Sequence, residues 1–226
     1  MNDRNWSDTL AIVVLGVLAF AGVCSGERRS SDYLSPLERV DEKITRYHVF
    51  LTEKLGVTPF DCGRVVDEPS FGPESIISIY SQTHNGRRAF YESSVQAEAN
   101  LWQRSKSMGD MGQTRAVGIR RVDAEIPQGV AEHIRQVWLR MLRDRHPWER
   151  SRLEFALSGY LRFSIQQPDG SPLEAELWLP AREPKRQALV QISEALWNYC
   201  RAAPASRPAI AKKIDREANR LLAWLK

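Results

Sequence analysis

The stretch that most constrains the fold runs from Arg152 to Pro180, and between Tyr160 and Leu179 apolar side chains recur at every second position on either side of a turn. A period of two is typical of β-strands that bury one face. Pro168-Asp169-Gly170 interrupts the pattern and suits a three-residue turn, because proline fixes the first φ and glycine accepts a left-handed last position. The stretch therefore predicts a β-hairpin whose apolar face must be covered by other elements.

The turn also fixes the register of the predicted hairpin. With the strand ends paired across it, one face carries only apolar residues. The other face places Tyr160 opposite Trp178 and Arg162 opposite Glu176, which are an aromatic pair and a pair of opposite charges. Cross-strand pairs of this kind contribute roughly 0.2–1 kcal/mol each. A slip by one residue would set apolar side chains against polar ones, so the pattern favours a single register.

The outer face of this hairpin, formed by Tyr160, Arg162, Glu176 and Trp178, is the candidate binding surface of the chain. Aromatic residues and arginine are enriched in protein interfaces, and an exposed patch of such residues indicates a partner. The alternative is that the two aromatic side chains only cover the sheet and seal its edge. The exposure of this face to solvent decides between the two interpretations.

Residues 9–23 form an uncharged apolar block near the N-terminus, and an Ala-x-Ala pattern lies near its end. The block is short for a membrane span and typical of a signal peptide, whose cleavage site has this pattern. We therefore expect residues 1–26 to be a signal peptide. The alternatives are an uncleaved N-terminal anchor, which would hold the protein at the membrane, or lipid modification at Cys24. Residues 27–226 then form a single domain that is periplasmic or secreted.

The composition is that of a globular domain, with 42% hydrophobic and 27% charged residues in a chain of 226. Apolar residues recur at helical spacing in four segments outside the hairpin. We expect these helices to begin near Ser35, Pro127, Pro184 and Pro208. Short turns, such as the one at Asn85-Gly86, join several strand-like segments. The order of elements predicts an α+β domain of two layers, an antiparallel sheet with helices mainly on one face.

The formal charge of +4 is modest for this length. Without periodic basic clusters it gives no nucleic-acid signature, and export also argues against such a partner. A basic run starts at the end of the second predicted helix and continues beyond it: Arg140, Arg143, Arg145, Arg150 and Arg152. The run could bind an anionic polymer of the envelope, whereas the simpler interpretation is a solvated helix end with favourable dipole contacts. A membrane contact is expected only through an uncleaved N-terminal segment.

The sequence contains no Gly-rich phosphate loop, no Gly-x-Ser-x-Gly and no His-Glu-x-x-His motif. Its four histidines lie far apart and form no metal-ligand spacing with cysteine. We therefore expect a non-enzymatic binding or accessory domain of the cell envelope, with another envelope protein as its partner and no metal or cofactor. The alternative is an enzyme of an unfamiliar, hydrolase-like type that uses Cys62 or Asp61.

Cys62 and Cys200 are the two cysteines, out of three, that fall within the predicted domain. Export implies an oxidising compartment, where paired cysteines persist as disulfides. A helix that crosses the sheet could bring Cys200, in its last turn, to Cys62 at the head of a strand. We therefore predict a disulfide between them, the alternative being two unrelated buried thiols.

Overall fold

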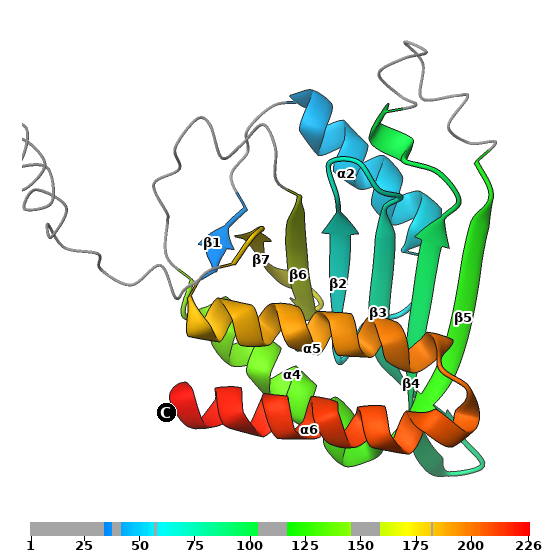
Figure 1. Ribbon diagram of the computed structural model, residues 1–226, viewed down its shortest axis with the longest axis vertical. Helices are drawn as coiled ribbons and strands as arrows, with labels where there is room; N and C mark the ends of the chain where they lie inside the picture. The colour runs from blue at the N-terminus through cyan, green and yellow to red at the C-terminus, as the bar shows by residue number, and fades with distance from the viewer. Residues whose placement is uncertain (1–33, 38–41, 57, 104–116, 146–158, 182) are drawn as a thin grey trace, which may run out of the picture. The chain divides into compact units, whose positions relative to one another are not determined.

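The computed structural model describes residues 34–37, 42–56, 58–103, 117–145, 159–181 and 183–226. An antiparallel sheet of seven strands runs through this part of the chain in the order β1-β7-β6-β2-β3-β4-β5 (Figure 1). The strands are β1 (Ser35–Pro36), β2 (Gly63–Glu68), β3 (Ser75–His84), β4 (Arg87–Ala97), β5 (Ile119–Ile126), β6 (Tyr160–Gln166) and β7 (Pro172–Trp178). The helices are α2 (Glu42–Leu55), α4 (Gln128–Arg143), α5 (Pro184–Arg201) and α6 (Arg207–Trp224), with the 3-10 turn η3 (Pro204–Ser206) before α6.

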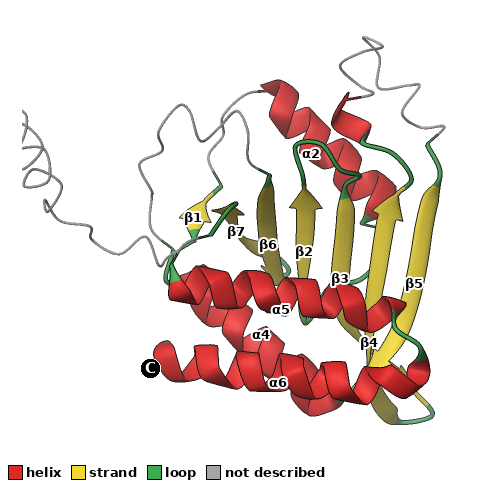
Figure 2. Ribbon diagram, viewed as in Figure 1, coloured by secondary structure: helices red, strands yellow, loops and turns green. Residues whose placement is uncertain are grey.

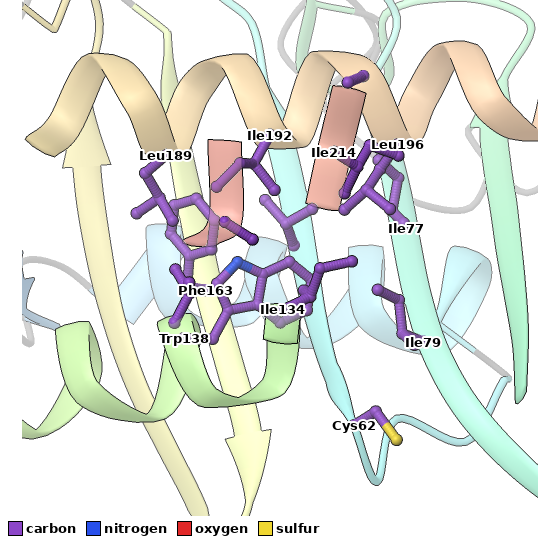
Figure 3. Packing of buried hydrophobic residues seen from close by; sticks show 14 of the residues in the cluster. Cys62, Ile77, Ile79, Ile134, Trp138, Phe163, Leu189, Ile192, Leu196 and Ile214 are labelled. Carbon is purple, nitrogen blue, oxygen red and sulfur yellow. The ribbon is translucent and has the colours of Figure 1, made fainter. Parts of the chain in front are cut away.

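Helices α4, α5 and α6 cover one face of the sheet, and α2 packs on the opposite face (Figures 1 and 2). The larger apolar core lies between the sheet and the three helices, around Trp138, Phe163 and Ile134 (Figure 3). A smaller core joins Leu51 and Leu55 of α2 to the other side of the sheet. The predicted α+β class with an antiparallel sheet is confirmed. The arrangement differs from the expected two layers because α2 adds a third.

The hairpin of β6 and β7 has the predicted register. The pairing runs without interruption from Tyr160 opposite Trp178 to Gln166 opposite Pro172. Gly170 closes the turn with φ of +83°, which glycine adopts without steric cost. Local alternation and turn chemistry therefore determine this part of the fold.

Ser35 lies in a strand and does not cap the first helix, contrary to the sequence prediction. Ser35–Pro36 forms β1, which pairs with β7 through Ser35 opposite Glu176 and becomes the edge strand in its place, and α2 is described from Glu42. The sequence at Ser35 resembles a helix cap, but an edge strand offers unpaired backbone groups that another strand can satisfy. A tertiary contact therefore prevails over the local capping signal.

Trp138 of α4 connects the three-helix layer to the sheet. Its indole is fully buried and stands edge-on to Phe163 of β6, with ring centroids 5.9 Å apart (Figure 3). The ring also lies directly against the backbone of Gly63, where an added Cβ would be 2.0 Å from its Cε3 atom. Gly63 has φ of +133°, so the backbone conformation and the indole both require glycine at this position.

Gly63→Ala should destabilise the domain much more than Gly86→Ala. Gly86 also has a positive φ of +74°, but no atom lies within 4 Å of a Cβ placed there. We expect Gly86→Ala to cost about 1–2 kcal/mol from backbone conformation alone, and Gly63→Ala to cost about 3 kcal/mol or more because overpacking is added. Urea denaturation of both variants measures the two losses. Equal losses would show that Trp138 makes room for the methyl group.

Candidate functional site

The four residues predicted to bind a partner lie together on the sheet face that carries α2. The rings of Tyr160 and Trp178 are 5.0 Å apart, and Trp178 donates from Nε1 to Glu176 at 3.3 Å. Trp178, Arg162 and Glu176 are only 9%, 7% and 6% exposed, and Tyr160 is half-buried. This face is therefore covered rather than open, and the binding role assigned to these residues stays a prediction.

The cluster has two further polar partners, Glu68 of β2 and His48 of α2, whose contacts with it the sequence pattern did not predict. The Tyr160 hydroxyl donates to Glu68 Oε2 at 2.5 Å and lies 2.5 Å from His48 Nε2. Arg162 Nη2 lies 3.7 Å from the other oxygen of Glu68. Glu68 reaches Tyr160 only because β2 pairs with β6, a long-range pairing that no local pattern reveals. The resulting network ties α2 to the sheet.

The predicted disulfide between Cys62 and Cys200 is wrong, because both are buried free thiols. The backbone N–H of Cys62 bonds Ile79 of β3 at 3.1 Å, at the head of β2. Cys200 lies over β4 and β5, with its Sγ 3.3 Å from the carbonyl oxygen of Glu92 and 3.5 Å from that of Val122. Strand β3 therefore separates the two residues. Neighbouring strands are about 4.8 Å apart, so two spacings exceed the Cα separation of about 7 Å that a disulfide can span.

Glu92 of β4, beside Cys200, is a second buried acid that the sequence did not single out. It is 0% exposed, and no described residue hydrogen-bonds to either carboxyl oxygen. Burial raises the pKa of Glu92 well above its ordinary value, and the nearby Cys200 and Arg207 offset this only in part. Burial and the neighbouring Glu92 also raise the pKa of the Cys200 thiol. The Cys200 thiol is therefore protonated at neutral pH, and Glu92 keeps its proton to a higher pH than an ordinary carboxyl group.

Glu92→Gln should stabilise the domain at pH 7, and the gain should be much smaller near pH 4. In the unfolded chain Glu92 ionises above about pH 4.3, whereas the folded state holds its proton to a higher pH. Wild-type stability is therefore greatest below that pH and falls by about 1.4 kcal/mol per pH unit as the pH rises towards the raised pKa. A glutamine at this position does not ionise, so the stability of the variant does not fall with pH for this reason. Denaturation curves of both proteins at several pH values measure the difference in their free energies of unfolding. A difference that does not change with pH would contradict the raised pKa of Glu92.

A cleft of about 700 Å³ opens where the β6–β7 turn faces α4. Its lining combines two arginines, Arg88 and Arg135, with three glutamines: Gln136, Gln166 and Gln167. The buried ring of Phe90 and the Asp61–Cys62 pair also contribute to its wall. Pockets of roughly 300–1,000 Å³ with a few convergent polar groups are typical of sites for small ligands. The cleft is therefore the candidate ligand site.

The cleft brings together the two residues on which the enzyme alternative depends. The Asp61 carboxylate accepts hydrogen bonds from the backbone and hydroxyl of Ser81, at 2.8 and 2.6 Å, and a longer one from Arg88 at 3.4 Å. Cys62 is 2% exposed, and burial raises the pKa of its thiol to about 11. Among the described residues that line the cleft there is no histidine to act as a base. The Cys62 thiol is therefore protonated at neutral pH, whereas a cysteine nucleophile needs a lowered pKa.

The basic run that starts at the end of α4 is only partly available to an anionic ligand. Arg140 donates to a backbone carbonyl of α6 at 3.4 Å, and Arg145 donates to a backbone carbonyl of β7 at 2.6 Å. Arg143 is exposed on α4. The other two members, Arg150 and Arg152, lie outside the described residues.

Within the described part of the chain, no three acidic, cysteine or histidine side chains form a group that could hold a metal ion. No helix there is both long and apolar enough to cross a membrane. The signal peptide or anchor predicted for residues 1–26, and Cys24 with it, lies outside the described residues.

Comparison with known proteins gives no assignment: no protein-family model, curated protein or solved structure matches the chain. The function is therefore inferred from the cleft and from the residues that line it.

Proposed function

We propose that the chain is an exported, non-enzymatic binding domain of the cell envelope, and that its ligand site is the cleft between the β6–β7 turn and α4. The chemistry of the cleft lining carries this proposal. Guanidinium and amide groups line the cleft, whereas the thiol in its wall has a pKa of about 11 and is protonated at neutral pH. Such a set of groups can hold a polar ligand without transforming it.

The arginines of the cleft support a binding role. Arg135 of α4 is exposed and makes no ion pair with any residue that the structure describes. Arg88 lies over the ring of Phe90, 5.0 Å from its centroid, and its ion pair with Asp61 is long at 3.4 Å. A guanidinium has five N–H donors in a fixed plane, so both side chains retain donors for a ligand.

The hairpin face gives less support to a protein partner. A docking surface needs accessible aromatic or arginine side chains that can be buried on binding, and Trp178 and Arg162 are already buried. Another envelope protein remains a proposed partner, but the cleft is the better-supported site. An anionic envelope polymer is the alternative ligand, held by the exposed Arg143 and its neighbours in the basic run.

Equilibrium dialysis of the full-length protein against soluble fragments of cell envelope tests the binding role. We expect the protein compartment to become enriched in a subset of fragments whose masses are unchanged, because the cleft holds a ligand and lacks an activated nucleophile. Mass spectrometry of both compartments measures enrichment and conversion together. Loss of a fragment with the appearance of its hydrolysis products would instead support the enzyme alternative.

A cleft-filling variant and a matched control locate the binding. Gln136 and Arg143 are both exposed on α4, and only Gln136 lines the cleft. Gln136→Trp should abolish the enrichment because the indole occupies the cleft, whereas Arg143→Trp should leave it unchanged. Enrichment that survives Gln136→Trp would place the ligand elsewhere and overturn the assignment of the cleft, and loss with Arg143→Trp alone would favour the basic run.

Export is tested separately, since it depends on residues 1–26. We expect the protein recovered from the periplasm or the medium to begin between residues 22 and 27, because the Ala-x-Ala pattern and the residues after it offer cleavage sites. Mass spectrometry of the intact protein determines its N-terminus. Recovery with an intact Met1 in the membrane fraction would exclude cleavage and support the anchor.

A further inference from the structure

We infer that the cleft binds the C-terminal end of a short peptide, with its carboxylate on Arg135 and Arg88 and its backbone amides on the glutamines of the cleft. The inference deepens the proposed function, on which it rests, by naming the class of ligand. Three observations carry it: the state of the two arginines, the nature of the amide groups, and the charge balance of the lining.

The two arginines provide a site for one carboxylate. Arg135 has no ion-pair partner among the described residues, and its neighbour Glu132, one helical turn earlier, already accepts a hydrogen bond from Gln128 at 2.6 Å. The guanidinium of Arg88 is positioned by the ring of Phe90, over which it lies, and by its ion pair with Asp61. Planar guanidinium groups bind carboxylates through paired, charge-assisted hydrogen bonds. A terminal carboxylate fits this pair of cations.

The amide groups of the cleft match a peptide backbone. Gln136 comes from α4, and Gln166 and Gln167 come from the end of β6. Each side-chain amide offers both a donor and an acceptor, which is the pairing that a peptide N–H and C=O require. Gln167 uses its Nε2 on the Ser171 hydroxyl at 2.9 Å and so keeps its carbonyl oxygen for a ligand.

In the described lining of the cleft, the balance of charge and the burial of Phe90 favour a peptide C-terminus over a phosphate or a sugar ligand. The lining holds two arginines and two acids, Asp61 and Glu132, so its formal charge is zero. A neutral site suits a singly charged carboxylate better than a dianionic phosphate. Phe90 is 4% exposed and lies beneath Arg88, so this ring offers no open face for stacking a sugar.

The experiment compares two tripeptide pools, one with free C-terminal carboxylates and one with C-terminal amides. Each pool is dialysed to equilibrium against the full-length protein, and retained peptides are quantified by mass spectrometry. We expect amidation to weaken retention about tenfold or more, because an amide lacks the negative charge that strengthens the hydrogen bonds from the two guanidinium groups. Acetylation of the N-terminus should have a much smaller effect.

Matched arginine variants complete the test. Arg135→Gln should weaken retention of the free-acid pool about tenfold and leave the amide pool unchanged, whereas Arg143→Gln on the same helix should change neither. Both positions are exposed, so both variants should keep the wild-type melting curve. Equal retention of the acid and amide pools, or no effect of Arg135→Gln, would overturn the inference.

The failure of this inference differs from the failure of the proposed function. If oligosaccharide fragments are retained, tripeptides are not, and Gln136→Trp abolishes the retention, the cleft is a ligand site but the peptide class is wrong. If the cleft-filling variant changes the retention of no fragment and no peptide, the cleft itself is not the site and both proposals fail.

Discussion

The contact between the Trp138 indole and the backbone of Gly63 is the constraint on which the arrangement of the sheet and the three helices depends. It sets how closely α4 approaches β2 and β6, and α5 and α6 then complete the core on that side. The same contact determines the cleft, because Cys62 in its wall precedes Gly63 and Glu132, Arg135 and Gln136 lie on the helix that Trp138 holds. The contact of Trp138 with Gly63 thus positions both the helical layer and the walls of the cleft.

A different interaction organises the opposite face. Arg64 of β2 is 5% exposed, and its Nη2 donates to the carbonyl oxygens of Gly56 and Thr58 at 2.7 and 2.5 Å. Its Nε donates to Ser78 at 3.2 Å, and its guanidinium lies over the ring of Phe60. Burial, and to a lesser degree neighbouring positive charge, lowers its pKa to about 10, so it remains charged at neutral pH. A buried cation thereby fixes the end of α2, where an isolated helix end would leave its carbonyls unsatisfied.

Sequence reasoning succeeded where the structure is determined by neighbours along the chain. The β6–β7 register follows from alternation and from the turn at Gly170, and the turn at Asn85-Gly86 follows from two residues that accept positive φ. It failed where distant segments meet. The contact between Glu68 and Tyr160 joins residues 92 positions apart, and the cleft draws its lining from four separate segments. The prediction of a disulfide was wrong for the same reason, since the position of Cys200 over β4 and β5 depends on how α5 crosses the sheet.

The free state of the two buried cysteines has a consequence for how the protein responds to oxidants. Oxidants attack the thiolate, and attack requires access to the sulfur. Cys62 and Cys200 are 2% and 1% exposed, and both have raised pKa values, so the folded domain protects them. Oxidative damage is then limited to molecules that have opened transiently, and its rate follows the population of the open state. Every interaction that stabilises the fold therefore also slows the oxidation of these two cysteines.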